Sequence, residues 1–311
     1  NYLTRELNTY LKNNVSQQHL KAVLPIILPM NKWLDLIRIR QWYKNVLVFL
    51  PLVFAAHFMN LNEILLTALG FIALCLVSSS SYIINDIIDR EADKNNPEKK
   101  IRPIASGVIS IKQGYAAAVL LLALGLLLAF FLSALFTAFA FAIFIITLIY
   151  SLKLKHIAIL DILSIAVNFV LRAVSGAYII SVIVSPWLII CTFFLSLFLS
   201  AGKRFSESEF LAKKAIKHRS VLSDYTPELT KALLNISTVS LIMAFSLYSF
   251  MSLYPMLVLT LPIAIYIIFR YLMLVYKGSI IARKTELLYT DKGLLIGLIV
   301  FLAAIFIIIY V

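Results

Sequence analysis

Cysteine and histidine are scarce in this chain of 311 residues, which contains two cysteines and four histidines. Cys75 and Cys191 fall inside apolar runs and form no CxxC pair, so the sequence predicts two buried thiols without a zinc site or a redox role. No metal-ligand spacing relates the histidines, which are His19, His57, His156 and His218. We therefore expect the chemistry of the protein to depend on other residue types.

The sequence also lacks an internal repeat, a low-complexity tract and a soluble domain. Its apolar residues run continuously instead of alternating with polar ones, which argues against a membrane β-barrel. With 62% hydrophobic residues and a mean hydropathy of +0.95, the chain has more apolar surface than a soluble core can bury. A spanning helix needs about 20 apolar residues. The sequence predicts an all-α membrane protein with nine transmembrane helices, near 46–60, 64–85, 114–132, 135–152, 160–181, 186–202, 232–253, 256–276 and 293–311.

The positive charges are distributed unevenly along the chain. Apart from Arg172 and Arg270, Lys and Arg lie before the first span or in alternate loops, namely 86–113, 153–159, 203–231 and 277–292. The intervening loops 61–63, 133–134, 182–185 and 254–255 contain none. Basic loops stay on the cytoplasmic side of a membrane, so we expect a cytoplasmic N-terminus. The net charge of +13 is thus explained by basic loops that set the membrane topology and that contact anionic lipids and anionic substrates. It does not indicate binding of nucleic acid.

The first residues differ from the remainder of the chain. Residues 1–35 are weakly amphipathic and are expected to form an interfacial lead-in or a linker, since they do not resemble a signal peptide. Residues 36–311 are expected to form a single membrane domain.

The stretch SYIINDIIDREADKNNPEKKIRPIASG, residues 81–107, concentrates charge between two apolar runs. If the preceding helix continues for two turns, one of its faces carries Asn85, Asp86, Asp89 and Asp93. Such carboxylates repel one another unless a cation lies among them, and Mg²⁺ prefers oxygen ligands combined with substrate phosphates. A basic cluster that can contact phosphate follows, made of Lys99, Lys100 and Arg102. The stretch predicts a site for Mg²⁺ and a diphosphate; the alternative is a solvated helix end.

The segment NDIIDREAD, residues 85–93, resembles the first aspartate-rich motif, NDxxDxxxD, of the UbiA superfamily of intramembrane prenyltransferases. The nine predicted spans and the RPIASG that follows the motif fit the same family. The resemblance implies a helical bundle around a central cavity that opens to the cytoplasm and to lipid. It also implies Mg²⁺ at Asp86, Asp89 and Asp93, with Asn85 beside them.

A second motif departs from the family pattern. Typical members carry DxxxD at the cytoplasmic end of the sixth span, where this chain has SAGKRFSESEF, residues 200–210. Lys203, Arg204, Glu207 and Glu209 stand there without an aspartate pair. A basic pair suits a phosphate held by charge, whereas a second metal would need Glu207 and Glu209. The departure disfavours the usual two-metal reaction on a prenyl diphosphate.

Further stretches resemble the branch of the superfamily formed by decaprenyl-phosphate phosphoribosyltransferases. They are RIRQWYKNVLVFLPL at 38–52, YSLKLKHIAILDI at 150–162, GKRFSE at 202–207 and SVLSDYT at 220–226. This resemblance implies transfer of 5-phosphoribose from 5-phosphoribosyl 1-diphosphate to a polyprenyl phosphate, with release of diphosphate. The candidate substrate-binding residues are Lys44, Asn45, Lys99, Lys100, Arg102, Tyr150, Lys153, Lys155, Asp161, Arg172, Lys203, Arg204 and Glu207. The alternative for Lys44 and Asn45 is an aromatic belt with topology charges, and the alternative for Tyr150 is an interfacial anchor.

Arg172 lies deep inside a predicted span, where a charged side chain is costly and is usually paired or functional. Asp161 shares its helix face but would lie about 16 Å away along the axis, too far for a direct pair. We expect Arg172 to face the cavity and bind a phosphate, or else to pair with another helix. Asn168 is expected to bond between helices, and Asp161 to cap its helix or bind substrate.

Two other functions fit the same pattern. One is ordinary prenyl transfer from a prenyl diphosphate to an aromatic or other lipid-soluble acceptor. The other is lipid binding or transport without catalysis, although a transporter more often places its charges near the membrane midplane. The richness in Lys, Ile and Asn favours a prokaryotic protein, for which we expect the plasma membrane. The basic loops and the family resemblance imply an active site on the cytoplasmic face of that membrane. The oligomeric state is left open.

Overall fold

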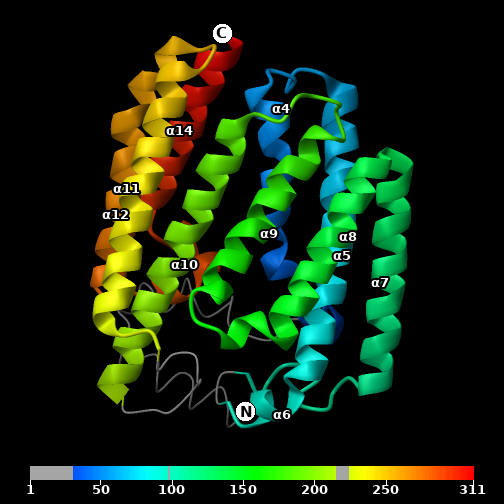
Figure 1. Ribbon diagram of the computed structural model, residues 1–311. Coiled ribbons are helices and arrows are strands. Elements are labelled where there is room, and N and C mark those ends of the chain that lie inside the picture. The colour runs from blue at the N-terminus through cyan, green and yellow to red at the C-terminus, as the bar shows by residue number, and fades with distance from the viewer. Residues whose placement is uncertain (1–30, 97–98, 215–223) are drawn as a thin grey trace.

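The computed structural model describes residues 31–311 except for 97–98 and 215–223. The described part of the chain folds into one bundle of helices (Figure 1). Its long helices are α5 (Leu61–Ile88), α7 (Ile111–Leu132), α8 (Ala134–Leu152), α9 (Leu160–Ala177), α10 (Pro186–Lys214), α11 (Pro227–Met251), α12 (Leu261–Tyr276) and α14 (Lys292–Tyr310). Within the described residues, eight helical segments are long and apolar enough to cross a membrane. The prediction of an all-helical membrane protein is confirmed.

Short helices connect the long ones. They are α3 (Lys32–Leu36), the 3₁₀ helix η1 (Ile39–Phe49), α4 (Leu50–Phe54), α6 (Arg90–Lys94), η2 (Leu154–His156), η4 (Pro255–Thr260), α13 (Ile280–Arg283) and η5 (Thr285–Thr290). Figure 1 shows α5, α7 and α8 on one side of the bundle and α11, α12 and α14 on the other, with α9 and α10 between them.

The first predicted span, 46–60, is not among the eight long helices. Its segment begins earlier, with η1 from Ile39, and ends with α4 at Phe54. Pro51 lies in the first turn of α4, and Ala56 has a positive φ of 60°, which turns the chain out of the helix. The expected lead-in over 1–35 falls mostly outside the described residues.

Close contacts hold η1 inside the bundle. Gly176 of α9 lies directly against η1, because a Cβ atom there would be only 2.0 Å from the carbonyl oxygen of Val48. Ser79, in a run of four serines on α5, donates to the carbonyl of Ile37 at 2.7 Å and accepts from Trp42 Nε1 at 3.1 Å. Small residues on α5 and α9 therefore allow the 3₁₀ segment to pack among longer helices.

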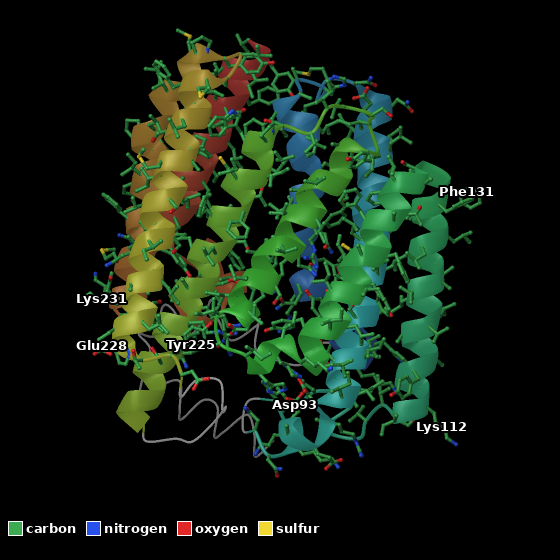
Figure 2. The ribbon with its side chains drawn as sticks, viewed as in Figure 1. Asp93, Lys112, Phe131, Tyr225, Glu228 and Lys231 are labelled. Atoms are coloured by element: carbon green, nitrogen blue, oxygen red, sulfur yellow. The ribbon has the colours of Figure 1, made fainter. Side chains whose placement is uncertain are left out.

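Large apolar side chains cover the outside of the bundle. Phe131 of α7 is 76% exposed, and Figure 2 shows it pointing away from the other helices. Val119 on the same helix and Ile299 on α14 are also exposed. An exposed apolar surface of this extent is unfavourable in water and suits contact with lipid tails. The protein is accordingly an integral membrane protein.

Candidate active site

The acidic motif lies where α5 ends. The condition that one helix continues through Asp93 is not met, since α5 ends at Ile88 and α6 begins at Arg90. Asp89 stands between them with φ −85° and ψ 4°, a conformation that tightens the turn. The spacing is nevertheless kept, because the Asp89 amide bonds to the Asn85 carbonyl and the Asp93 amide bonds to the Asp89 carbonyl.

Each aspartate of the motif is paired with a cation. Asp86 accepts from Arg38 and from Arg102 Nη1, the latter at 3.0 Å. The same Arg102 atom donates to Asp93 at 2.6 Å, and Lys155 Nζ donates to Asp89 at 2.5 Å. Asp86 and Asp93 are both 2% exposed, and a buried charge is costly unless it is paired and hydrogen-bonded, as both are here. Across the described residues, no group of three His, Cys, Asp or Glu side chains converges to hold a metal.

Arg38 was not predicted, although it stands in the RIRQWYKN stretch. It occupies the left-handed region with φ 51° and ψ 50°, which costs a non-glycine residue about 1–2 kcal/mol. Its guanidinium lies 5.1 Å from the centre of the Tyr82 ring as well as against Asp86. Burial lowers the pKa of Arg38, but the charge of Asp86 and its hydrogen bond outweigh burial and leave the pKa raised. Arg38 is thus a fixed cation behind the motif.

A polar cavity of about 260 Å³ opens beside the motif. It is lined by Asn85, Asp89, Lys99, Arg102, Tyr150, Lys155, Ile165, Ser200, Lys203, Arg204 and Glu207. Five of these side chains are cationic and two are anionic, whereas Ile165 is the one aliphatic residue. The lining therefore offers charge and hydrogen bonds to a ligand and very little apolar surface.

The wall opposite the acidic motif comes from α10. Arg204 Nε donates to Asp161 at 2.8 Å, and Arg204 Nη1 donates to Glu207 at 2.5 Å. Lys203 Nζ lies 3.9 Å from Glu207. Glu207 is thus shared by two cations, which disfavours it as a metal ligand in this arrangement. The side chain of Glu209 lies outside the described residues.

Asp161 is completely buried and does not line the cavity. Its carboxylate accepts from Arg204, from the amide of Ile162 at 2.8 Å and from the hydroxyl of Tyr225. The expected cap of α9 by Asp161 is wrong, because the N-cap is Ile159, which has no side-chain cap bond, and Asp161 lies inside the first turn. Tyr225 was not predicted by name, because its partners are more than 60 positions away along the chain and leave no local signal.

The predicted residues divide into two groups. The cavity brings together Asn85, Asp89, Lys99, Arg102, Tyr150, Lys155, Lys203, Arg204 and Glu207. Those that do not line it are Lys44, Asn45, Asp86, Asp93, Lys100, Lys153, Asp161 and Arg172. Asp86 and Asp93 lie directly behind Arg102, whereas Lys100 and Lys153 are exposed.

Arg172 has amide partners and not carboxylate partners among the described residues. Its Nε donates to Asn45 at 2.8 Å, and its Nη1 donates to the carbonyl at 3.1 Å and to the side-chain oxygen of Asn168. Asn168 in turn donates to Thr147 of α8 at 2.9 Å, so its expected bond between helices is confirmed. Arg172 connects α9 to η1, and its binding of a phosphate stays a prediction.

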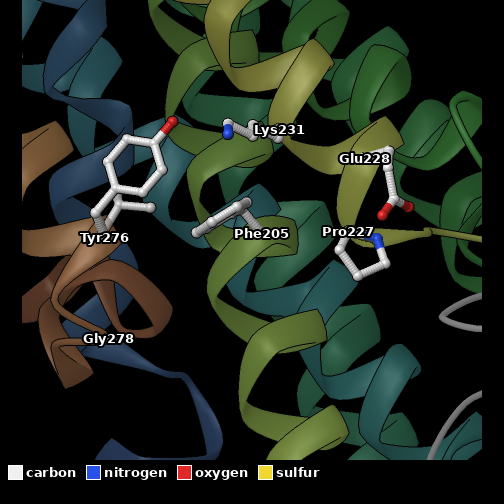
Figure 3. Close-up of a pocket in the computed structure, with 7 residues that line it drawn as sticks. Phe205, Pro227, Glu228, Lys231, Tyr276 and Gly278 are labelled. Carbon is white, nitrogen blue, oxygen red and sulfur yellow. The ribbon is translucent and has the colours of Figure 1, made fainter.

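A second cavity of about 460 Å³ lies on the other side of α10 (Figure 3). Its lining is Phe205, Pro227, Glu228, Lys231, Val275, Tyr276 and Gly278, with none of the predicted site residues. Consecutive residues of α10 therefore serve different cavities, Arg204 the polar one and Phe205 the larger one. The smaller cavity is the candidate active site because Asn85 and Asp89 of the acidic motif line it.

The sequence is similar to those of known proteins. A model of the UbiA prenyltransferase family matches residues 46–289. A decaprenyl-phosphate phosphoribosyltransferase of Mycolicibacterium smegmatis is 34% identical over 219 residues, which are 69% of this chain and 69% of that protein. An uncharacterized protein of Sinorhizobium fredii, y4nM, is 38% identical over 180 residues, 58% of this chain; the match covers 35% of that relative's own length.

The fold is shared with solved structures as well. A UbiA homologue from Archaeoglobus fulgidus, bound to DMAPP and Mg²⁺, has a TM-score of 0.65 to this structure at 22% sequence identity. The likeness covers 90% of this chain and all of that one. The expected helical bundle is therefore confirmed at the level of the fold.

Proposed function

The chain belongs to the UbiA prenyltransferase family, and from that membership we propose that it transfers 5-phosphoribose from 5-phosphoribosyl 1-diphosphate to a membrane polyprenyl phosphate. A phosphate oxygen of the lipid forms the new bond to the anomeric carbon of the sugar. The bond from that carbon to the diphosphate oxygen breaks, and diphosphate leaves with the electron pair. The lipid phosphate is already ionised at neutral pH, so the reaction needs no general base.

The composition of the polar cavity carries this proposal. A prenyl diphosphate places an apolar chain directly beside its diphosphate, and that chain would meet Ile165 as the one aliphatic lining residue. A phosphorylated sugar diphosphate is polar along its whole length and matches a lining of cations, carboxylates and hydroxyls. The M. smegmatis relative, named for the same activity, supports the same choice.

Charges on two walls suit a donor with phosphates at both ends. Lys99 and Arg102 lie with the acidic motif, while Lys203 and Arg204 lie across the cavity on α10. Cations fixed in a partly dry site stabilise negative charge as it develops on a leaving group. We assign the diphosphate to the side of the acidic motif and the 5-phosphate to the side of α10.

The acidic motif has the chemistry to hold Mg²⁺. One Arg102 nitrogen bridges Asp86 and Asp93 at 3.0 and 2.6 Å, so the two carboxylates are close enough to share a single cation. Carboxylate oxygens and a diphosphate form the donor set that Mg²⁺ prefers. Asp86, Asp89 and Asp93 would hold the ion, which would neutralise the charge of the departing diphosphate. Arg102 would then be released to bind phosphate oxygens.

We also propose nine crossings with a cytoplasmic N-terminus. The 11 residues of η1 and the 5 of α4 rise about 2.0 and 1.5 Å each, about 30 Å together, which is the thickness of the hydrocarbon core. This segment is therefore long enough to act as the first span, with Arg40 and Lys44 in its cytoplasmic half, from which long basic side chains can reach the membrane surface. Nine spans place every basic loop, and the polar cavity, on the cytoplasmic face of a plasma membrane.

A donor test distinguishes the functions. Purified protein in lipid with Mg²⁺ is given 5-phosphoribosyl 1-diphosphate, labelled in the sugar, and a polyprenyl phosphate; a second reaction contains a labelled prenyl diphosphate and an aromatic acid. We expect sugar label in the lipid phase, and its loss in Asp89→Asn. Product from the prenyl donor alone would assign ordinary prenyl transfer, and product from neither would contradict both transferase activities for these substrates.

A further inference from the structure

Tyr225, which lies between α10 and α11, is connected to the polar cavity through two side chains. Its hydroxyl accepts from the amide of Ile159 at 2.9 Å and donates to the buried carboxylate of Asp161. Asp161 in turn accepts from Arg204, a lining residue of the cavity. Tyr225 is 2% exposed, so the hydroxyl has no access to a ligand of its own.

Arg204 is held on one side and open on the other. A guanidinium has five N–H groups. The Nε–H is bound to Asp161 and one Nη1–H to Glu207, which leaves three without a protein partner among the described residues. Since Arg204 lines the cavity, these groups are the natural donors to a ligand oxygen there. Asp161 and Glu207 together fix the plane of the Arg204 guanidinium.

The hydroxyl of Tyr225 helps Asp161 to fix the orientation of the Arg204 guanidinium. Burial raises the pKa of Tyr225 and the bond to Asp161 raises it further, so the hydroxyl stays protonated and acts as a donor. Asp161 has no second cation beside it among the described residues, and two of its three hydrogen-bond partners are Tyr225 and Arg204. Without the hydroxyl, only the amide of Ile162 would hold that carboxylate oxygen, so the orientation of the carboxylate and of Arg204 bound to it would be less fixed.

We propose that Tyr225 and Asp161 are positioning residues that orient Arg204 to bind a phosphate group of the donor. The proposal rests on the proposed function only in taking the ligand to be a phosphate of the donor. It explains why a tyrosine from the segment before α11 is anchored at the start of α9. It also means that the α10 wall of the cavity is a preorganised anion site, with the orientation of Arg204 fixed by neighbouring side chains.

The test uses Tyr225→Phe in the full chain, purified in lipid. Binding of inorganic diphosphate with Mg²⁺, and of ribose 5-phosphate, is measured by calorimetry. We expect the Kd of at least one of them to rise by about tenfold, the effect of a lost hydrogen bond to a charged group. Leu229→Ala is the matched control, because it removes packing beside the Tyr225 ring and keeps the hydroxyl; its Kd values should stay at the wild-type level.

A double-mutant cycle separates positioning from a purely structural role. Arg204→Lys keeps the positive charge but removes the planar guanidinium that Asp161 orients. Tyr225→Phe should therefore weaken binding of the anion probes no further in the Arg204→Lys background. Multiplicative effects, an unchanged Kd in Tyr225→Phe, or wild-type protein that binds neither probe would overturn the proposal. If Tyr225→Phe does not fold, Asp161→Glu replaces it in the same cycle. Loss of sugar transfer with normal anion binding would contradict the proposed function alone.

Discussion

At the scale of single residues, Arg102 has an unusual position because it serves two buried carboxylates at once. Asp86 keeps Arg38 as a second partner, and Asp93 keeps Lys99, whose Nζ lies 3.6 Å away. The motif is therefore neutralised by the protein itself. When a diphosphate binds with a metal ion, the ion could replace the basic side chains at the carboxylates, and the phosphates could pair with those side chains. No charged group would then be left without a partner.

Removing the shared guanidinium should weaken the fold and favour metal binding. In Arg102→Gln we expect the free energy of unfolding to fall by about 1–3 kcal/mol, because Asp86 and Asp93 lose a charged partner. Mg²⁺ should then raise the unfolding temperature of the variant more than that of the wild type. Thermal unfolding in lipid measures both effects. Lys100→Gln, an exposed change in the same loop, is the control; equal Mg²⁺ responses in all three proteins would contradict the prediction.

Residue types could be predicted from the sequence more readily than residue pairs. Asp89, Lys155 and Arg204 were identified because charges at the ends of apolar runs are conspicuous, and the structure places all three at one cavity. Arg38 and Tyr225 were not identified. Their contacts depend on how distant helices pack, and neither the left-handed conformation of Arg38 nor the burial of Tyr225 has a local sequence signal.

At the scale of elements, the start of α14 shows how a helix end and an ion pair share one side chain. Asp291 accepts from the amide of Leu294 at 2.8 Å and so caps α14. The same carboxylate accepts from Arg270 of α12 at 3.0 and 2.9 Å. The bond to Arg270 is the largest cause of the lowered pKa of Asp291. Cap and pair together fasten α14 to α12.

This link should make stability depend on pH in the acid range. The pKa of Asp291 is lower in the folded than in the unfolded protein, so its contribution is complete above about pH 3.9 and is lost as pH falls through the folded value. We expect wild-type unfolding temperature to fall more steeply below pH 4 than that of Asp291→Asn. At pH 7 the variant should be less stable by about 1 kcal/mol. If the unfolding temperatures of the two proteins fall in parallel as the pH is lowered, Asp291 does not make this contribution.

The positions of the helices were predicted better than the residues at which they end or whether they are α or 3₁₀ helices. Continuous apolar runs are enough to place α7 or α14, because a spanning helix must satisfy its own backbone hydrogen bonds. The 3₁₀ form of η1 has no local sequence signal, and the contacts that η1 makes, such as that of Val48 with Gly176, come from distant parts of the chain. Asp89, where the helix breaks, likewise pairs with Lys155, a residue 66 positions later.

At the scale of the whole molecule, charged groups gather at one end of the bundle. Figure 2 shows Asp93, Lys112 and Tyr225 at the same end, although they come from different segments. Lining residues of the polar cavity come from three of the basic loops predicted from the sequence, 86–113, 153–159 and 203–231. This clustering accounts for the proposed orientation in the membrane.

Labelling of introduced cysteines tests that orientation. Lys112→Cys and Leu253→Cys place exposed thiols at the start of α7 and after α11. A membrane-impermeant maleimide applied outside intact cells should label Leu253→Cys only, and Lys112→Cys should react after the membrane is opened. Wild-type protein, whose Cys75 is buried, gives the background. Labelling of both variants from outside would exclude the nine-span arrangement.

The imbalance of five cations and two carboxylates around the polar cavity has a kinetic consequence. An excess of positive charge in a recess between low-dielectric helices draws anions from solution before any contact is made, and this attraction fades when salt shortens its range to about 10 Å or less. The same field acts on the head groups of anionic lipids. Soluble donor and surrounding membrane therefore compete for the mouth of the cavity, and the rate of capture depends on lipid charge and ionic strength.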